Sequence, residues 1–219
     1  MSTLPLRLPV RLLALIAACF TCAKGADEPA AKPIFDGKSL TGWKITDFAG
    51  RGEVTVKDEQ LILAAGDPLT GVNCTQEAPK TNYELSLEAM RIEGSDFFCG
   101  LTFPVGATSV TFVVGGWGGT LVGISSIDGE DASENSTTQF VKFDSKKWYK
   151  IRVRVTPAKI QAWINDEQQV DVSAEGKKLG MRAGEIELSA PFGIATFRTE
   201  AALKNIQIKP IAAEPPAAK

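Results

Sequence analysis

Polar and apolar residues alternate along much of the central part of the chain. In the stretch YELSLEAMRIE, residues 83–93, every second residue from Tyr83 to Ala89 is apolar and the residues between them are polar. The stretch WYKIRVRV, residues 148–155, alternates in the same way. A period of two puts successive side chains on opposite faces of an extended backbone. Both stretches are therefore predicted to be strands with one face in a core and the other toward water.

Short apolar runs between turn residues predict further strands. These runs are found at 53–58, 60–65, 97–105, 110–117, 160–165 and 169–172, and the segments EIELSA, GIATFRT and LKNIQIKPI follow near the end of the chain. The sequences TPAK and DEQ provide turns between consecutive strands, and no segment has a convincing helical pattern. Many short strands at close spacing predict an all-β fold, either an antiparallel β-sandwich or a barrel.

The beginning of the chain has the organisation of a removable signal peptide, predicted over 1–25. Arg7 and Arg11 form a short positive region, the nine apolar residues LLALIAACF follow, and AKG then supplies small residues for cleavage. Nine apolar residues are too few to span a bilayer, which needs about 20. We expect an exported protein, periplasmic or extracellular. Alternatively, the tetrapeptide IAAC resembles a lipoprotein processing box, in which Cys19 would be lipidated and would anchor the chain.

Two spacers rich in small residues frame the predicted domain. ADEPAAK at 26–32 and AAEPPAAK at 212–219 contain Pro and Ala and have no strand pattern, so both are expected to be flexible. One all-β domain is therefore predicted over 33–211.

The composition narrows the possible chemistry. The chain has no histidine, which excludes Ser-His-Asp and Cys-His mechanisms and the usual zinc sites. Acid–base work would then fall to carboxylates, Lys, Arg or Tyr. Loss of the leader leaves 21 basic and 26 acidic residues, a net charge of −5 without a basic stripe, so no nucleic-acid partner is expected. Cys74 and Cys99 would remain after export, either as one disulfide or as two small buried thiols.

One stretch gathers four carboxylates within seven positions, namely Asp128, Glu130, Asp131 and Glu134. It can be interpreted as a charged loop in solvent or as a site whose chemistry needs acids. A third interpretation is a Ca²⁺ site, because Asp128, Asp131, Glu134 and Asn135 offer hard oxygen ligands. The spacing does not match an EF-hand loop, and no metal ligand is assigned.

Trp117 lies in the sequence GGWGG, where no neighbouring side chain covers its ring. An aromatic face stacks well on the C–H face of a sugar. Glycine also permits the opposite arrangement, a buried Trp where the backbone approaches closely. Trp148 and Trp163 lie within the alternating stretches and are expected to pack against the sheet, while Glu185 and Glu187 are expected on a solvated strand face.

Three further stretches resemble a known family. IFDGKSLTGWK at 34–44 resembles the opening, and LKNIQIKPI at 203–211 the last strand, of a large bacterial family of exported domains, the 3-keto-disaccharide hydrolases. The segment at 146–171 resembles the meander of their concanavalin A-like lectin/glucanase fold. The resemblance implies a jelly-roll β-sandwich with a concave sheet on which sugars lie, and a carbohydrate ligand or substrate.

The resemblance also implies a route for cleaving a glycosidic bond. A ketone at C3 of the sugar acidifies the C2 hydrogen, so that a carboxylate can remove this proton and the C1 substituent leaves by elimination, with water adding afterwards. Asp131 or Glu134 would be the base, and Lys142 or Arg91 would stabilise the enolate. The residues expected to bind substrate are Trp117, Asp128 and Asn135. Two alternatives remain open: a carbohydrate-binding module without catalysis, and a cell-surface scaffold anchored through Cys19.

Overall fold

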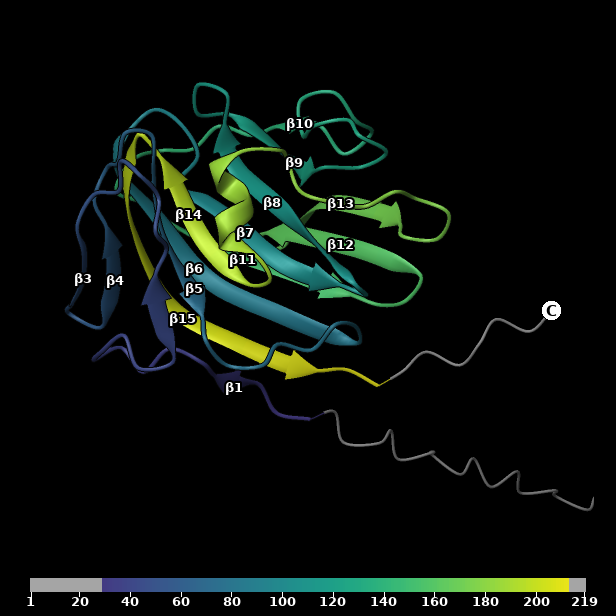
Figure 1. Ribbon diagram of the computed structural model, residues 1–219, viewed down its shortest axis with the longest axis horizontal. Coiled ribbons are helices and arrows are strands. Elements are labelled where there is room, and N and C mark those ends of the chain that lie inside the picture. Colours follow the sequence, from purple (N-terminus) through teal and green to yellow (C-terminus); the bar gives the residue numbers. More distant parts are fainter. Residues whose placement is uncertain (1–28, 213–219) are drawn as a thin grey trace, which may run out of the picture.

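Two antiparallel sheets face each other across a hydrophobic core in the computed structural model, which describes residues 29–212 (Figure 1). The described strands are, in chain order, β1 (Lys32–Pro33), β2 (Trp43–Ile45), β3 (Val54–Lys57), β4 (Gln60–Leu63), β5 (Leu69–Cys74), β6 (Tyr83–Gly94), β7 (Cys99–Val105), β8 (Thr108–Gly116), β9 (Leu121–Ser125), β10 (Gln139–Phe140), β11 (Trp148–Val155), β12 (Lys159–Ile164), β13 (Glu167–Ser173), β14 (Gly193–Phe197) and β15 (Thr199–Pro210). The predicted all-β antiparallel sandwich is confirmed.

The eight-stranded sheet has the order β13-β12-β11-β6-β15-β4-β3, with β1 paired to β15. The seven-stranded sheet has the order β10-β9-β8-β7-β14-β5-β2. Consecutive strands are mostly hairpin neighbours, whereas β6, β14 and β15 lie beside strands distant in sequence. All the described strands, from the first to the last, therefore belong to one sandwich.

The alternation in β6 and β11 places their apolar residues between the sheets. Leu85, Leu87 and Ile151 are at most 2% exposed, and β11 pairs with β6 over its whole length. The facing layer comes from β7 and β8, whose Phe103 and Phe112 are fully buried. Burying such side chains is the main favourable contribution to the stability of the sandwich.

The segment EIELSA does not form the predicted strand. Glu185–Ser189 is a short 3-10 helix, η1, which packs against β5 and β14. Both sides of β14 are already paired, with β5 and β7, so this segment cannot form a hairpin with the strand that follows it. It lies across the outer face of the seven-stranded sheet instead, with Ile186 toward the sheet and Leu188 exposed. Glu185 and Glu187 are therefore helical residues, and the prediction that they share a strand face is wrong.

The described domain extends from β1 to β15. Lys32 already belongs to β1, which pairs with β15 at the other end of the domain. The predicted signal peptide, Cys19 and the end of the chain lie outside the described residues. Cys74 and Cys99 are free thiols, and burial raises the pKa of both. Within residues 29–212, no helix has the length and the apolar run that a membrane crossing requires.

Candidate functional site

Small residues form the centre of the outer face of the seven-stranded sheet. The strand register brings Gly123, Val113, Gly100, Ala195 and Gly71 into one row across five strands. A Cβ atom at Gly100 would lie 2.9 Å from the ring of Phe97, which shows that this ring lies directly over the glycine. Because the side chains of this row are small, there is space over the outer face of the sheet. Larger side chains from loops border that space.

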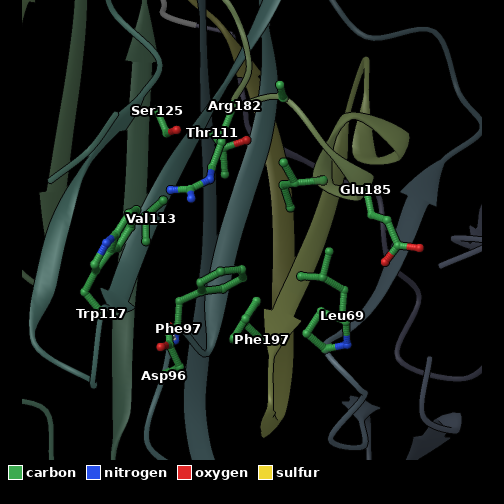
Figure 2. Close-up of a pocket in the computed structure, with 13 residues that line it drawn as sticks. Leu69, Asp96, Phe97, Thr111, Val113, Trp117, Ser125, Arg182, Glu185 and Phe197 are labelled. Atoms are coloured by element: carbon green, nitrogen blue, oxygen red, sulfur yellow. Dashed lines mark hydrogen bonds between the residues drawn. The ribbon is translucent and has the colours of Figure 1, made fainter. Parts of the chain in front are cut away.

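This space is a cavity of about 450 Å³ that is open to solvent on one side, and we call it the sheet hollow (Figure 2). Its lining comes from the sheet, from the β8–β9 turn, from the segment before β7 and from the segment that contains η1. The lining residues are Pro68, Leu69, Asp96, Phe97, Thr111, Val113, Trp117, Ser125, Arg182, Ala183, Glu185, Ile186 and Phe197. A volume of this size with an apolar wall and a few polar groups is typical of small-molecule sites.

Trp117 is at the tip of the β8–β9 turn and borders the sheet hollow. The residue is 44% exposed, which agrees with the exposed arrangement of the two that the sequence left open. The turn needs glycine on both sides of the tryptophan: Gly115 and Gly119 have φ angles of 80° and 105°. A Cβ at Gly115 would lie 2.7 Å from the guanidinium of Arg91. The glycines of GGWGG are therefore explained by backbone conformation and by the space that Arg91 occupies.

Arg91 lies between the two sheets and does not line the sheet hollow. It is 6% exposed, and its Nη2 donates to the carbonyl oxygens of Gly119 at 3.0 Å, Asp96 at 3.3 Å and Gly115 at 3.5 Å. Its guanidinium also lies 5.1 Å from the centre of the Phe98 ring. Burial lowers the pKa of Arg91, although the nearby Asp96 carboxylate opposes this shift. In this position Arg91 supports the Trp117 turn from inside.

Asp96 supports the same turn from the solvent side. Its carboxylate accepts the backbone N–H of Phe97 at 2.7 Å and that of Gly118 at 3.3 Å. Together with Arg91, it ties the segment before β7 to the turn that presents Trp117. The indole is therefore held by contacts on both sides of the turn.

Arg182 enters the sheet hollow from a segment at 176–184 that we call the strap. The strap pairs with the acidic stretch: Ser126 and Gly180 exchange backbone hydrogen bonds of 2.6 and 3.1 Å, and the N–H of Asp128 donates to the carbonyl of Lys178 at 2.8 Å. The guanidinium of Arg182 lies 5.5 Å from the centre of the Trp117 ring. Figure 2 shows it pointing toward Val113 and Trp117.

Asp131, one of the predicted bases, is the partner of Arg182. Its Oδ2 forms an ion pair with that guanidinium, and its side chain is 14% exposed. Its Oδ1 accepts the hydroxyl of Ser125 at 2.5 Å and the N–H of Ala132 at 2.7 Å. Asp131 does not line the sheet hollow itself, but both Ser125 and Arg182 do. The carboxylate is therefore connected to the hollow through its two partners.

The other predicted residues are not gathered around the sheet hollow. Glu134 is exposed and borders a neighbouring cavity of about 360 Å³, together with Asp131 and part of the strap. Asp128 binds the strap, since its carboxylate pairs with Lys177 at 2.8 Å and accepts the N–H of Lys178 at 2.8 Å. Lys142 is exposed and lines neither cavity.

Asn135 is buried, and both ends of its side-chain amide form hydrogen bonds within and beside the acidic stretch. Its Nδ2 donates to the carbonyls of Ile124 and Asp131, each at 2.8 Å, and to that of Glu130 at 3.2 Å. Its Oδ1 accepts the N–H and the hydroxyl of Thr137 at 3.0 and 2.6 Å. These contacts give Asn135 a structural role in shaping the loop.

The four side chains considered for Ca²⁺ do not converge. Asp128 and Asp131 each pair with a different basic residue of the strap, and the amide oxygen of Asn135 faces Thr137. Among residues 29–212, no three Cys, Asp or Glu side chains lie close enough together to hold a metal ion. The arrangement of the acidic stretch therefore gives no support to a cation site.

Several residues of the sheet hollow carried no recognisable signal in the sequence. Asp96 and Phe97 stand in an ordinary loop, and Arg182 is 51 positions from the aspartate that it pairs with. Glu185 was placed on a solvated face, yet it lines the hollow and accepts the N–H of Ala49 at 3.2 Å. Only the closing of the sandwich brings these segments to the same place.

Comparisons with known proteins agree with this architecture. The sequence profile of the 3-keto-alpha-glucoside-1,2-lyase-like domain matches residues 30–209. No curated protein matches the chain.

Solved structures with the same fold share little sequence with the chain. A Bacillus subtilis protein of unknown function with a galectin-like fold is 11% identical, covers 85% of this chain and 99% of its own, and has a TM-score of 0.61. Domain 4 of the arabinanase AbnA from Geobacillus stearothermophilus, in complex with arabinotriose, is 14% identical, with coverage of 86% and 96% and a TM-score of 0.54. The carbohydrate-binding module CBM66 from Bacillus subtilis is 13% identical, with coverage of 77% and 95% and a TM-score of 0.52. At these identities the likeness concerns the fold alone.

Proposed function

The chain belongs to the family of 3-keto-alpha-glucoside-1,2-lyase-like domains, and from this premise we propose that it binds a saccharide in the sheet hollow. The observation that carries the proposal is the Trp117 ring, which is 44% exposed at the border of the hollow. An indole offers an apolar face to the C–H bonds of a sugar ring. The hydroxyls of Thr111 and Ser125 and the guanidinium of Arg182 offer hydrogen bonds nearby. The matched family is carbohydrate-related. The sequence motifs at the beginning and the end of the domain predicted this.

Proteins with the same fold support this proposal. One of them is described as a carbohydrate-binding module, and another was solved with arabinotriose. The fold is therefore compatible with saccharide binding, while the proposal for this chain rests on Trp117 and its surroundings.

Titration with saccharides tests the proposal directly. Intrinsic tryptophan fluorescence and calorimetry would be followed while methyl glucosides and glucose disaccharides are added. Replacing Trp117 by alanine should weaken binding about tenfold, because a stacked aromatic ring contributes about 1–1.5 kcal/mol. The matched control is Trp163→Ala, which removes an indole that lies under Arg152 on the other sheet. Equal losses in both variants, or no binding of any saccharide at millimolar concentration, would contradict the proposal.

A second candidate function is cleavage of a 3-keto glycoside, favoured by the charged groups that border the hollow. Glu185, whose carboxylate accepts the N–H of Ala49 in the free protein, would have to turn toward the hollow to accept the C2 proton. Arg182 would stabilise the enolate oxygen that forms at C3. Collapse of the enolate would restore the C3 ketone, form the C1–C2 double bond and break the bond from C1 to the glycosidic oxygen, which takes up a proton from water as it leaves. The pair predicted from sequence, Asp131 and Glu134, borders the neighbouring cavity and remains the alternative source of the base.

Release of aglycone from a 4-nitrophenyl 3-keto-glucoside distinguishes these assignments. Glu185→Gln and Glu134→Gln are matched variants, because both side chains are exposed and each borders a different cavity. Loss of the base should lower the rate about 100-fold or more. If Glu134→Gln lowers the rate of aglycone release more than Glu185→Gln does, the base belongs to the acidic stretch. No release by the wild type, with binding intact, would leave a carbohydrate-binding module.

The proposal places this activity outside the cytoplasm. The support is the leader pattern in the sequence, with its two arginines and nine apolar residues. Expression of the full chain in a bacterial host, followed by fractionation and mass determination, tests this. Cleavage near residue 25 would support a soluble exported form, a lipid-modified Cys19 would support an anchored one, and an intact cytoplasmic chain would contradict both.

A further inference from the structure

The lining of the sheet hollow changes from polar to apolar along the direction of the strands. At one end the register places Ser125 of β9 beside Thr111 of β8. At the other end it places Phe197 of β14 beside Leu69 of β5. Val113 lies between these two rows, two residues along β8 from Thr111. Figure 2 shows Ser125, Thr111 and Arg182 at one end of the cavity and Phe197 and Leu69 at the other.

The apolar end is formed by side chains that pack on one another. The rings of Phe97 and Phe197 have centres 5.7 Å apart, and both belong to a hydrophobic cluster with Leu69, Ile186 and the fully buried Phe48. All of these except Phe48 also line the sheet hollow. The cluster therefore continues into the cavity as an apolar wall that no polar side chain covers completely.

The charged groups near the apolar end are occupied elsewhere. Asp96 directs its carboxylate to the N–H groups of Phe97 and Gly118. Glu185 accepts an N–H from Ala49, on the side away from the Phe97 ring. A hydroxyl group placed against the two phenyl rings would therefore find few partners.

The polar end has hydrogen-bonding groups held in fixed positions. The hydroxyl of Thr111 lies 2.8 Å from that of Thr102, and the hydroxyl of Ser125 donates to Asp131. Arg182 is held at the same end by Asp131. Trp117 borders the cavity between this end and the Phe97 ring. A sugar ring fits here, with one face on the indole and its hydroxyls toward Ser125, Thr111 and Arg182.

We propose that the ligand of the sheet hollow is a glycoside with an aromatic or similarly apolar aglycone, bound with its sugar at the polar end and its aglycone against Phe97 and Phe197. This inference rests on the proposed function and specifies its substrate class. The cavity of about 450 Å³ is in the range that accommodates small organic ligands. Phenyl rings pack on one another edge to face or offset, and Phe97 and Phe197 both line the cavity.

The same wall disfavours a second sugar at the apolar end. A disaccharide carries hydroxyls on both rings, and hydroxyls that lose water without gaining a partner reduce affinity. An aromatic aglycone instead removes apolar surface of both partners from water. A purely apolar ligand is disfavoured for the opposite reason, because it would strip water from Arg182 and from the two hydroxyls at the polar end.

Calorimetry on the full mature chain with matched ligands tests the inference. Phenyl and methyl glucosides of both anomers would be compared with maltose, cellobiose and phenol. We expect one phenyl glucoside to bind at least tenfold more tightly than its methyl counterpart, than either disaccharide and than phenol. Phenyl and methyl glucosides that bind within threefold of each other would overturn the inference and leave the proposed function intact. Phenol binding as tightly as phenyl glucoside would also overturn it, and absence of binding by every saccharide would overturn both.

Variants locate the aglycone. Phe97→Ala should reduce the affinity ratio between phenyl and methyl glucoside from tenfold or more to threefold or less, whereas Trp117→Ala should weaken both ligands. Ile186→Ser on η1 provides a second test of the apolar wall if the first variant does not fold. Phe140→Ala is the matched control, because this phenylalanine is 74% exposed and lies outside the cavity. An unchanged ratio in both wall variants would overturn the placement of the aglycone.

Discussion

Replacing Arg91 by methionine would remove the group that supports the Trp117 turn from inside the sandwich. Methionine keeps most of the length of the side chain but cannot donate a hydrogen bond. The buried carbonyl of Gly119 and the partly buried carbonyl of Asp96 would lose donors at 3.0 and 3.3 Å, whereas the 3.5 Å contact with Gly115 contributes little. We therefore expect the turn to loosen and Trp117 to lose its fixed position.

The magnitude follows from these contacts. A hydrogen bond from a charged donor contributes about 1.5–3 kcal/mol, and a buried acceptor left without a donor costs about 1–3 kcal/mol. Two such bonds are lost, but removal of a buried charge and packing of the methionine on Phe98 offset part of the loss. The net decrease in the free energy of unfolding should be about 2–4 kcal/mol.

Urea denaturation measures this change, with fluorescence and circular dichroism as independent probes. The matched control is Arg51→Met, because Arg51 is 44% exposed and pairs only with the exposed Asp47 among the described residues. That variant should cost no more than about 0.5 kcal/mol. In native Arg91→Met the Trp117 emission should shift and saccharide binding should weaken. A decrease in stability below about 0.5 kcal/mol, with normal binding, would refute the assignment of Arg91 as the support of the turn.

Three further results are expected. Gly100→Val should lower the free energy of unfolding in urea by about 1–3 kcal/mol, because a Cβ there would lie 2.9 Å from a phenyl ring; an unchanged midpoint would show that the ring moves aside freely. A hydrogen bond from Lys177 lowers the pKa of Asp128 below its usual 3.8, so its contribution to stability is present above that pH and disappears as pH falls through the lowered pKa. Asp128→Asn should therefore have a lower urea midpoint than the wild type at pH 7, and the difference should shrink as the pH is lowered below 3.8; a constant difference would contradict this. Peptide mapping after iodoacetamide treatment of the native protein should find Cys74 modified and the fully buried Cys99 protected, whereas equal modification of both would contradict the burial of Cys99.

The alternating stretches were sufficient to predict the sandwich because burial on one face of a strand is a local property. The apolar residues from Tyr83 to Ala89 point between the sheets as their spacing requires. EIELSA also alternates, yet it forms η1, because β14 already has a strand on each side. The alternating pattern indicates which residues prefer burial. Whether the segment becomes a strand also depends on a strand edge being free beside it, and the pairing of distant strands decides that.

Only part of the candidate site could be predicted from local sequence patterns. Trp117 was identified because the glycines on both sides leave its ring uncovered by neighbouring side chains. The acids of the neighbouring stretch were identified by their density, but the chain uses Asp128 and Asp131 to hold the strap and Asn135 to shape the loop. The two aspartates are paired with side chains about 50 positions away, which no local pattern reveals.

The sequence by itself determined most of the strands, their buried faces and the family, because these depend on neighbouring residues and on short motifs. It left open whether the indole of Trp117 is exposed. The tertiary structure alone decided that Arg91 is a support inside the sandwich, that Arg182 reaches the indole and that Phe97 meets Phe197 across a row of small residues. Each of these contacts joins residues that are far apart in the chain, such as Arg91 and Gly119, which are separated by 28 positions. The strand order brings such segments together, and the chemistry of the cavity depends on that order.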